Sequence, residues 1–527
     1  MCTHFENKNH MRWRWFFLTA GLLLLVLGLM LPAAAEAKTV TADVAILDHV
    51  LVFNRLGAQN LNGMIYALKR DLVDATSLEP CGDACTAGNT ILRPDKRPRP
   101  LVLRVSAGDT LVVNFTNLLT INANPDPPLP EEANPDLGAL NEPNNQVAGR
   151  QAGFHVQGLQ LAATGGIGND ASNVGNNESS LATPAGGTKI YSYIAEKEGA
   201  FLVTSMGATF GGEATGGNVG VGAFGAVIVE PKDARYYRSQ ITEEELRLAT
   251  TGNTADGHPI INYEATYPNS PPWSLEGKGG LPILNMLQNN KIVHADINAI
   301  IAGPNPDGSF EGYGPGSTYP QYNPSYPNRL EAFREFVSIF HDETAAANAF
   351  HGFFSDPVLG HTLHGVRDSF MINYGSGGIG SEIIANRLGV GPMWDCLDCA
   401  YEEFFLTSFT VGDPAMLVDL PANVGIEGTT VPNPLDLGPK ATKAFYPADP
   451  ANVHHNYTGD HVKIRNLHAG PKEQHIFHMH NHQWLFNPND DNSNYLDAQG
   501  IGPGSGYTYE LVNGGSGNRN KTSGDVI

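Results

Sequence analysis

Histidines are concentrated near the C-terminal end of this 527-residue chain, where eight of its 18 histidines fall between positions 454 and 482. Four of them stand in the segment QHIFHMHNHQW. Neutral imidazole is the commonest metal ligand among side chains, and it suits copper, zinc, iron and nickel. The segment therefore predicts a metal site. The eight residues are His454, His455, His461, His468, His475, His478, His480 and His482.

The spacing within that segment is more informative than the clustering, because the residues between the histidines favour a β-strand. Successive side chains of a strand point to opposite faces of the sheet. His478 and His480 should therefore share one face, and His475 should lie on the other. We expect one imidazole to serve one metal and the pair to serve another.

Other arrangements of metal ligands are less well supported. A zinc-dependent or cupin-type metalloenzyme is one alternative, but the segment has no Glu at cupin spacing and no H-E-x-x-H motif that would pair ligands with a general base.

A second candidate cluster contains histidines next to glycine, which more often face solvent or bond to the backbone than bind metal. This cluster comprises His341, His351, His361 and His364.

Five cysteines are present, and Cys2 lies in the N-terminal segment. The other four form two close pairs, Cys81 with Cys85 and Cys396 with Cys399. In an oxidising compartment such spacing favours two local disulfides over metal binding, although sequence alone leaves three connectivities open. None of the four is flanked by histidine.

The composition limits the classes of partner. The formal net charge is −22, and this excludes nucleic acid, because a phosphate backbone requires a basic surface. A cationic substrate or a metal ion would be attracted instead. With 59 Gly, 36 Pro and 41% hydrophobic residues, the chain is expected to form loop-rich globular β structure in two or three domains.

The N-terminal segment, residues 1–37, has the features of a secretory signal peptide. Lys8, Arg12 and Arg14 precede a largely apolar run over residues 15–31, and a small-x-small cleavage site follows at 35–37. A membrane anchor is the alternative, since this run approaches the length of a bilayer span. We expect cleavage, no stable membrane span afterwards, and a periplasmic or extracellular location.

Alternating apolar runs separated by turn residues predict an all-β fold of tandem Greek-key β-sandwiches with long loops and insertions. Residues 100–117 predict two strands around a Gly-Asp turn, and residues 241–250 predict a short acidic helix. We expect one sandwich over residues 38–232, a connecting segment over 233–328, and a second sandwich over 329–527 that carries the histidine motif.

The H-x-x-H-x-H spacing resembles the third copper motif of the multicopper oxidases. This resemblance implies that His475 binds type 1 copper and that His478 and His480 belong to the type 2/type 3 trinuclear centre. His482 matches a position that is usually not a ligand. RPLVLRVSAGDTLVVNFTNLL, GAFLVTSMG and DHVKIRNLHAG are likewise similar to strands of cupredoxin domains, so the resemblance implies that both sandwiches are cupredoxin-like.

The chain also departs from the family pattern. The first copper motif would read H-x-H-G, but this chain has His155 followed by Gln157, and Thr204 and Met206 stand where the second motif would carry histidines. The first sandwich is therefore expected to lack copper ligands. The fourth motif, H-C-H, is absent, and the final residues SGDVI are similar to those that directly precede it. We expect the chain to be the front part of a longer oxidase, with loss of the copper centres as the alternative.

The resemblance implies a multicopper oxidase that couples one-electron oxidation of a reducing substrate to reduction of dioxygen to water. Large bacterial members with a reordered set of motifs, including manganese-oxidising types, have a similar arrangement. A metal ion such as Mn(II) is the preferred substrate and a phenol is the rival. A non-catalytic copper-binding or structural cupredoxin module is the alternative function. The chain as given is expected to lack a complete active site.

Overall fold

The computed structural model describes most of the first 302 residues and several later segments, which include the histidine motif. Contacts within the chain separate residues 1–38 from residues 39–527. The predicted signal peptide lies almost entirely outside the described residues. The described ranges are 37–302 with breaks at 53–57, 61–62, 97, 122–148, 163–179, 208–216, 240, 254 and 256–258, then 332–342, 347–348, 370–375, 454, 461–470, 473–480, 482–487 and 492–512.

Two sheets enclose the first hydrophobic core. Sheet I has seven strands, in the order β10-β11-β8-β1-β18-β17 with β4 paired to β1, and sheet II has the order β7-β13-β12-β9. Along β8 the side chains of Leu111, Val113 and Phe115 are buried in the core between the sheets, while Asn114 faces solvent. The strands of sheet I are β1 (Thr39–Asp48), β4 (Met64–Leu68), β8 (Thr110–Asn117), β10 (Gln160–Leu161), β11 (Gly187–Ile194), β17 (Leu287–Gln288) and β18 (Lys291–Ile292), and those of sheet II are β7 (Leu101–Ser106), β9 (His155–Val156), β12 (Gly199–Thr204) and β13 (Phe224–Glu230).

The connections between these sheets are of the Greek-key kind. β7 and β8 are neighbours in the sequence but lie in different sheets, and so do β11 and β12. β1 pairs with β8 in parallel, as β7 does with β13, which an up-and-down meander would not allow. Gly108, with φ +96°, forms the turn between β7 and β8. The predicted all-β sandwich class and the two strands predicted over residues 100–117 are confirmed.

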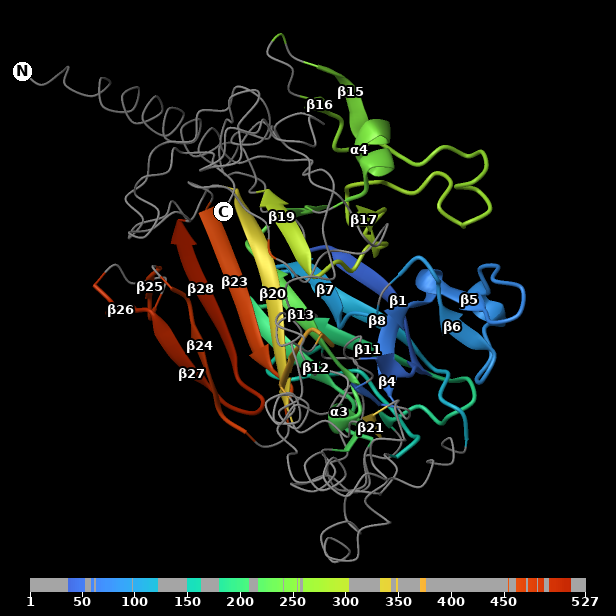
Figure 1. The fold of residues 1–527 in the computed structure, drawn as a ribbon, viewed down its shortest axis with the longest axis horizontal. Helices are drawn as coiled ribbons and strands as arrows, with labels where there is room; N and C mark the ends of the chain where they lie inside the picture. The colour runs from blue at the N-terminus through green and yellow to red at the C-terminus, as the bar shows by residue number, and fades with distance from the viewer. Residues whose placement is uncertain are drawn as a thin grey trace, which may run out of the picture. The chain divides into compact units, whose positions relative to one another are not determined.

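Sheet III has six strands, in the order β14-β19-β20-β23-β28 with β22 paired to β20. Figure 1 shows β19, β20, β23 and β28 side by side. Every residue of β20 and β23 is buried, because one face of each strand packs on sheet II and the other on a smaller outer layer. The strands are β14 (Arg235–Arg238), β19 (Asn298–Ala302), β20 (Phe333–Asp342), β22 (Phe370–Ile372), β23 (His461–His468) and β28 (Gly506–Val512), and the outer layer consists of β24 (His475–His478) with β27 (Ala498–Ile501) and β25 (Trp484–Leu485) with β26 (Tyr495–Leu496).

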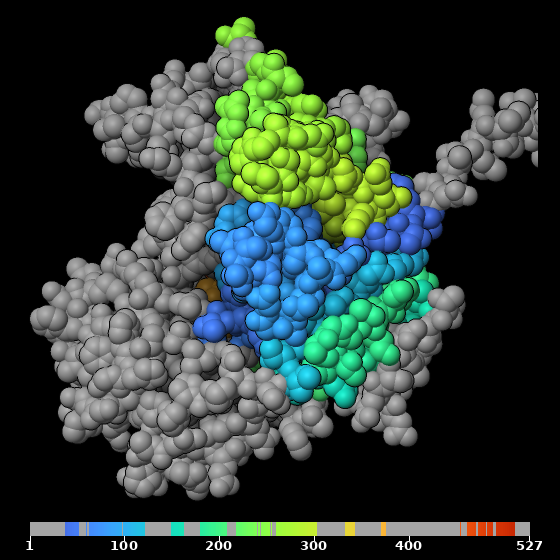
Figure 2. Space-filling model, turned by 90° about the vertical axis from the view of Figure 1, so that its right-hand side faces the viewer, coloured from blue at the N-terminus to red at the C-terminus, as the bar shows by residue number. Residues whose placement is uncertain are grey.

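The segment expected to connect the two sandwiches contributes strands to sheet III. β14 pairs with β19, and β19 pairs with β20. The helix expected over residues 241–250 is confirmed as α4 (Glu243–Ala249), which begins with a capping box between Thr242 and Glu245. Lys278, from this segment, forms an ion pair with Asp95, and Figure 2 shows the two neighbouring surfaces in yellow-green and blue.

The remaining elements are short. β2 (Leu51–Val52), β3 (Ala58–Asn60) and β21 (Ala347–Asn348) form one small sheet, β5 (Leu72–Asp74) pairs with β6 (Thr90–Leu92), and β15 (Thr250–Asn253) pairs with β16 (Pro259–Ile261). The single-turn helices are η1 (Lys69–Asp71), η2 (Gly82–Ala84) and α3 (Gly217–Gly220). Within the described residues, no helix has both the length and the apolar character needed to cross a bilayer.

The cysteine pairing is settled at one of the two predicted positions. Cys81 and Cys85 form a disulfide across η2, as expected from their spacing. Cys396 and Cys399 lie outside the described residues.

A buried group of four ionisable side chains, the central ion cluster, joins sheet II to sheet III. It consists of Arg104 on β7, Glu230 on β13, Glu335 on β20 and Arg465 on β23, each no more than 2% exposed. Both arginines donate to Glu335, Arg104 Nε to Oε1 and Arg465 Nε to Oε2, each at 2.9 Å. Arg465 also reaches Glu230 at 3.2 Å.

The two carboxyls of the central ion cluster differ in their protonation. Burial raises the pKa of Glu230 well above its ordinary value, and repulsion from Glu335 adds to that rise. Burial also opposes ionisation of Glu335, but Arg104 and Arg465 outweigh it and hold its pKa below the ordinary value. Glu335 is therefore the anion that both arginines share.

Replacing Arg465 with methionine should destabilise the protein strongly, because Glu335 would lose one of its two compensating charges. Removing one partner of a buried pair typically costs about 3–5 kcal/mol. The free energy of unfolding, measured with urea, should fall by about this amount. Arg247→Met is the matched control, since Arg247 pairs with Glu244 on an exposed helix face and such pairs contribute about 0.5 kcal/mol or less. Equal losses in the two variants would contradict the role of the cluster.

Candidate metal centre

The histidine motif begins on β24, which distributes its side chains between two faces. His475 and Phe477 are half-buried towards sheet III, whereas Ile476 and His478 are exposed. Phe477 stacks on Tyr509 of β28 with ring centroids 4.5 Å apart, which holds β24 against the sheet. His475 and His478 consequently lie on opposite faces, as the alternation predicts.

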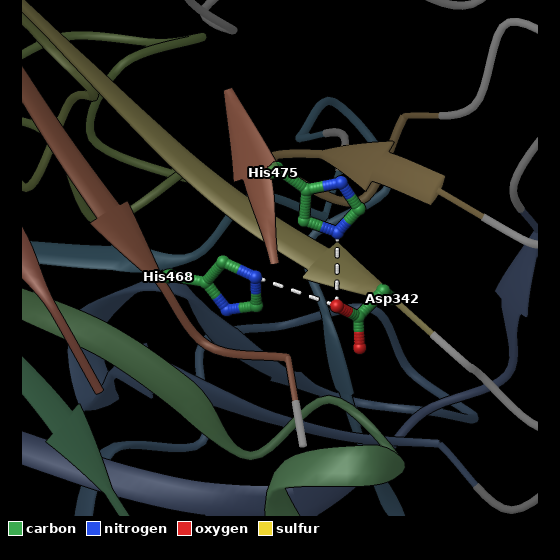
Figure 3. Close-up of side chains that lie close together, drawn as sticks. All are labelled: Asp342, His468 and His475. Carbon is green, nitrogen blue, oxygen red and sulfur yellow. Dashed lines mark hydrogen bonds and ion pairs between the residues drawn. The ribbon is translucent and has the colours of Figure 1, made fainter. Parts of the chain in front are cut away.

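His475 lies against Asp342 and His468 (Figure 3). Its Nε2 is 2.9 Å from Asp342 Oδ2, and the imidazoles of His475 and His468 stack with centroids 5.1 Å apart. His468 Nε2 approaches the same carboxylate oxygen at 3.4 Å. Within the described part of the chain, these three side chains form the only group of three ligand-type residues close enough to share one metal ion.

Asp342 and His468 meet because two parallel strands end together. β20 and β23 pair in register, with Phe340 opposite His468, so Asp342 stands near the end of the neighbouring strand. Burial alone would raise the pKa of the Asp342 carboxyl, but hydrogen bonds from His468 and His475 outweigh it and hold the pKa below its ordinary value. The carboxylate is therefore ionised at neutral pH.

His478 and His480 form a separate pair on the exposed face. Their ring centroids are 4.8 Å apart in an edge-to-face arrangement. β24 ends at His478, so the turn that follows, rather than continued strand alternation, brings His480 beside it. His478 Nδ1 lies 2.7 Å from the backbone carbonyl of Asp497 and must donate to it, since a carbonyl only accepts. In the neutral ring, Nε2 then carries the lone pair that a metal requires.

The other histidines of the cluster take structural positions. His482 is buried and donates from Nδ1 to the backbone carbonyl of His480 at 2.9 Å, which orients the turn. His461 is buried, with Nε2 2.8 Å from Glu510 Oε1. His454 stacks on Phe336. His455 lies outside the described residues.

The second candidate cluster is described only at His341. This residue is buried, bonds to the Val219 carbonyl at 2.9 Å and packs on Phe224. Burial lowers its pKa to about 4. These are the contacts of a neutral core histidine. His351, His361 and His364 lie outside the described residues.

The two altered motifs of the first sandwich lie next to each other. His155 on β9 pairs with Thr204 on β12, and Met206 accepts a hydrogen bond from the Thr204 hydroxyl. The described residues of these two motifs thus bring one imidazole, at His155, beside a hydroxyl and a thioether rather than beside the further imidazoles that a trinuclear copper centre needs.

Asp342 received no role from the sequence, and His468 was recognised only as a member of the histidine cluster. The two stand 126 positions apart, and only the pairing of β20 with β23 brings them together. The sequence offered only a local signal. Asp342 lies near the end of the apolar strand pattern LEAFREFVSIFHDE, and His468 lies near the end of DHVKIRNLHAG. Nothing in either segment indicates which strand is its neighbour.

The donor atoms fit a copper ion in part. His478 offers Nε2, His480 lies beside it, and His475 keeps Nδ1 because its Nε2 is bonded to Asp342. Nitrogen ligands of this kind suit copper. A type 1 site also requires a thiolate, and the only cysteines of the described residues, Cys81 and Cys85, are joined in a disulfide. The described residues therefore fit imidazole-bound copper but not a complete type 1 site.

Comparisons with known proteins give only distant similarity. No family model matches the chain, and no curated protein matches it. Among solved structures, a copper nitrite reductase from Nitrosomonas europaea is 12% identical with a TM-score of 0.33, over 90% of this chain and 85% of that one. A blue copper oxidase from Nitrosomonas europaea is 14% identical with a TM-score of 0.34, over 90% and 76%. Such low scores do not bear on function.

Diethyl pyrocarbonate should modify His478 and His480 faster than His468 and His341. The first two are exposed, whereas the latter two are at most 1% exposed. Peptide mass spectrometry over a time course gives the rate at each residue. Rates at His468 equal to those at His478 would contradict the exposure of the outward pair.

Proposed function

We propose that this chain is a copper-dependent oxidoreductase of the multicopper oxidase kind. The observation that carries the proposal is the H-x-x-H-x-H motif on β24, in which His478 is oriented by a backbone carbonyl and lies beside His480. His475 faces the opposite way, as separate metal sites require. By resemblance, His475 takes the type 1 role, and His478 and His480 take the trinuclear role.

The chain's own residues hold and orient the ligands. The Asp497 carbonyl keeps the His478 proton on Nδ1, and Phe477 anchors the strand between the two sites. When bound, copper supplies one-electron redox chemistry, by which four electrons and four protons convert one dioxygen to two waters. The described residues supply no thiolate, so we assign no electron-transfer step to particular residues.

The preferred reducing substrate is a metal ion such as Mn(II), with a phenol as the rival. A net charge of −22 attracts a cation and repels an anion. An exported location, periplasmic or extracellular, is supported by the Cys81–Cys85 disulfide, because disulfides persist mainly in oxidising compartments.

A second candidate function is a non-catalytic copper-binding module. The disulfide between the only cysteines of the described residues favours it, since a module without a thiolate ligand could bind copper without forming the type 1 centre. The two functions differ in what they predict for catalysis but share the histidine ligands.

Changing both His478 and His480 to alanine should abolish copper binding at this pair, because it removes both imidazoles. Isothermal titration with Cu(II) on the protein beginning at residue 38 measures the loss, with Zn(II) as the competing metal. His155→Ala is the matched control and should leave copper affinity unchanged, since His155 lies in the first sandwich. Unchanged affinity in the double variant, or preference for Zn(II), would refute the assignment. The chain over residues 38–527 should show no intense blue absorption, because none of its cysteines is flanked by histidine as the type 1 thiolate would be.

Oxidation assays should distinguish the oxidase from the module and identify the substrate class. The copper-loaded protein, encoded by the full reading frame, is supplied with air and either Mn(II) or a phenolic dye. We expect consumption of dioxygen with Mn(II), and less with the dye. Activity with the dye alone would remove the metal-oxidase proposal, and activity with neither substrate would favour the module.

A further inference from the structure

We propose that Asp342 is a positioning residue: it holds the proton of His475 on Nε2 and so presents Nδ1 as the metal-binding atom. This inference rests on the proposed function only in its final step, the binding of a metal at His475. The first step concerns the metal-free protein and depends on geometry alone.

The direction of the hydrogen bond follows from the chemistry of the two groups. An ionised carboxylate has no proton to give, so His475 Nε2, 2.9 Å from Asp342 Oδ2, is the donor. A neutral imidazole carries one proton, and with that proton on Nε2 the lone pair is on Nδ1. Ligating histidines commonly direct their other nitrogen to a carboxylate in this way.

His468 holds Asp342 from the other side and is not itself suited to bind a metal. The backbone N–H of Gly470 donates to His468 Nδ1 at 3.0 Å, so the proton of the neutral ring is on Nε2. That atom faces Asp342 Oδ2 at 3.4 Å. Both Nε2 atoms around the carboxylate therefore carry protons, and a metal bound among the three side chains would have to displace them. The group orients His475 rather than forming a metal site.

Packing restricts each member of the group. Asp342 is 2% exposed and His468 is fully buried. The ring of His475 packs against two neighbours. Its centroid lies 4.6 Å from that of Phe370, and it stacks on His468 at a 21° interplanar angle. Gly470 lies so close to the Asp342 carboxylate that a Cβ at position 470 would overlap it. The carboxylate has no room to turn away from His475.

The test compares the tautomer of His475 in metal-free variants. With ¹⁵N-histidine labelling and His475→Gln to assign the signals, wild type should show His475 protonated on Nε2. Asp342→Leu should give a mixture of tautomers, because it removes the acceptor at similar volume. Asp342→Asn keeps an acceptor oxygen and should restore the Nε2 form. Asp83→Leu, at an exposed position, is the control.

A second variant tests position without changing charge. Gly470→Ala should displace the carboxylate and produce the same mixture of tautomers as Asp342→Leu. If Asp342→Leu fails to fold, as judged by circular dichroism, Gly470→Ala and Asp342→Asn decide the question. A wild-type His475 protonated on Nδ1, or a tautomer that neither Asp342→Leu nor Gly470→Ala alters, would overturn the proposal.

Metal titration separates this inference from the proposed function. Cu(II) affinity at His475 should fall about 10–100-fold in Asp342→Leu, the usual effect of losing a residue that orients a ligand, and recover in Asp342→Asn. If His475→Ala leaves copper binding unchanged, His475 is not a copper ligand, and the type 1 role proposed for it fails. The tautomer result in the metal-free protein would stand independently. If His475→Ala weakens binding but Asp342→Leu does not, the positioning role fails alone.

Discussion

The central ion cluster is the constraint on which the arrangement of the sheets depends. Arg104 and Glu230 come from sheet II, whereas Glu335 and Arg465 come from sheet III, and burial allows these charges few alternative partners. Apolar side chains pack between the sheets as well, but apolar contacts are non-directional. Two arginines that must both reach one carboxylate permit far fewer relative positions. The cluster thereby fixes β20 and β23 against sheet II.

The placement of β20 and β23 against sheet II determines the geometry of the candidate metal centre. Glu335 and Asp342 lie on the same strand, as do Arg465 and His468, so fixing Glu335 and Arg465 also constrains where β20 and β23 end. β24 then packs over the outer face through Phe477, which brings His475 to Asp342 while His478 faces outward. A buried polar interaction between two sheets thus determines where an imidazole meets a carboxylate at one edge.

Much of the fold and part of the site could be predicted from sequence. Strand alternation placed β7 and β8 correctly, residues 241–250 indicated the short acidic helix, and the division of His475 from His478 followed from strand periodicity. Asp342 could not be predicted as a partner of His475, because the pairing of β20 with β23 depends on distant charges rather than on local pattern. His480 lies beside His478 because a turn follows β24, and strand alternation does not predict the geometry of a turn.

The two halves of the histidine motif differ in how easily mutation could disturb them. The acceptor that orients His478 is the main-chain carbonyl of residue 497, which every amino acid possesses, so replacing the Asp497 side chain leaves that acceptor in place. The acceptor that orients His475 is a side chain, and one nucleotide change in its codon can remove it. The orientation of His478 is accordingly insensitive to the side chain at position 497, whereas the orientation of His475 depends on retaining both Asp342 and Gly470.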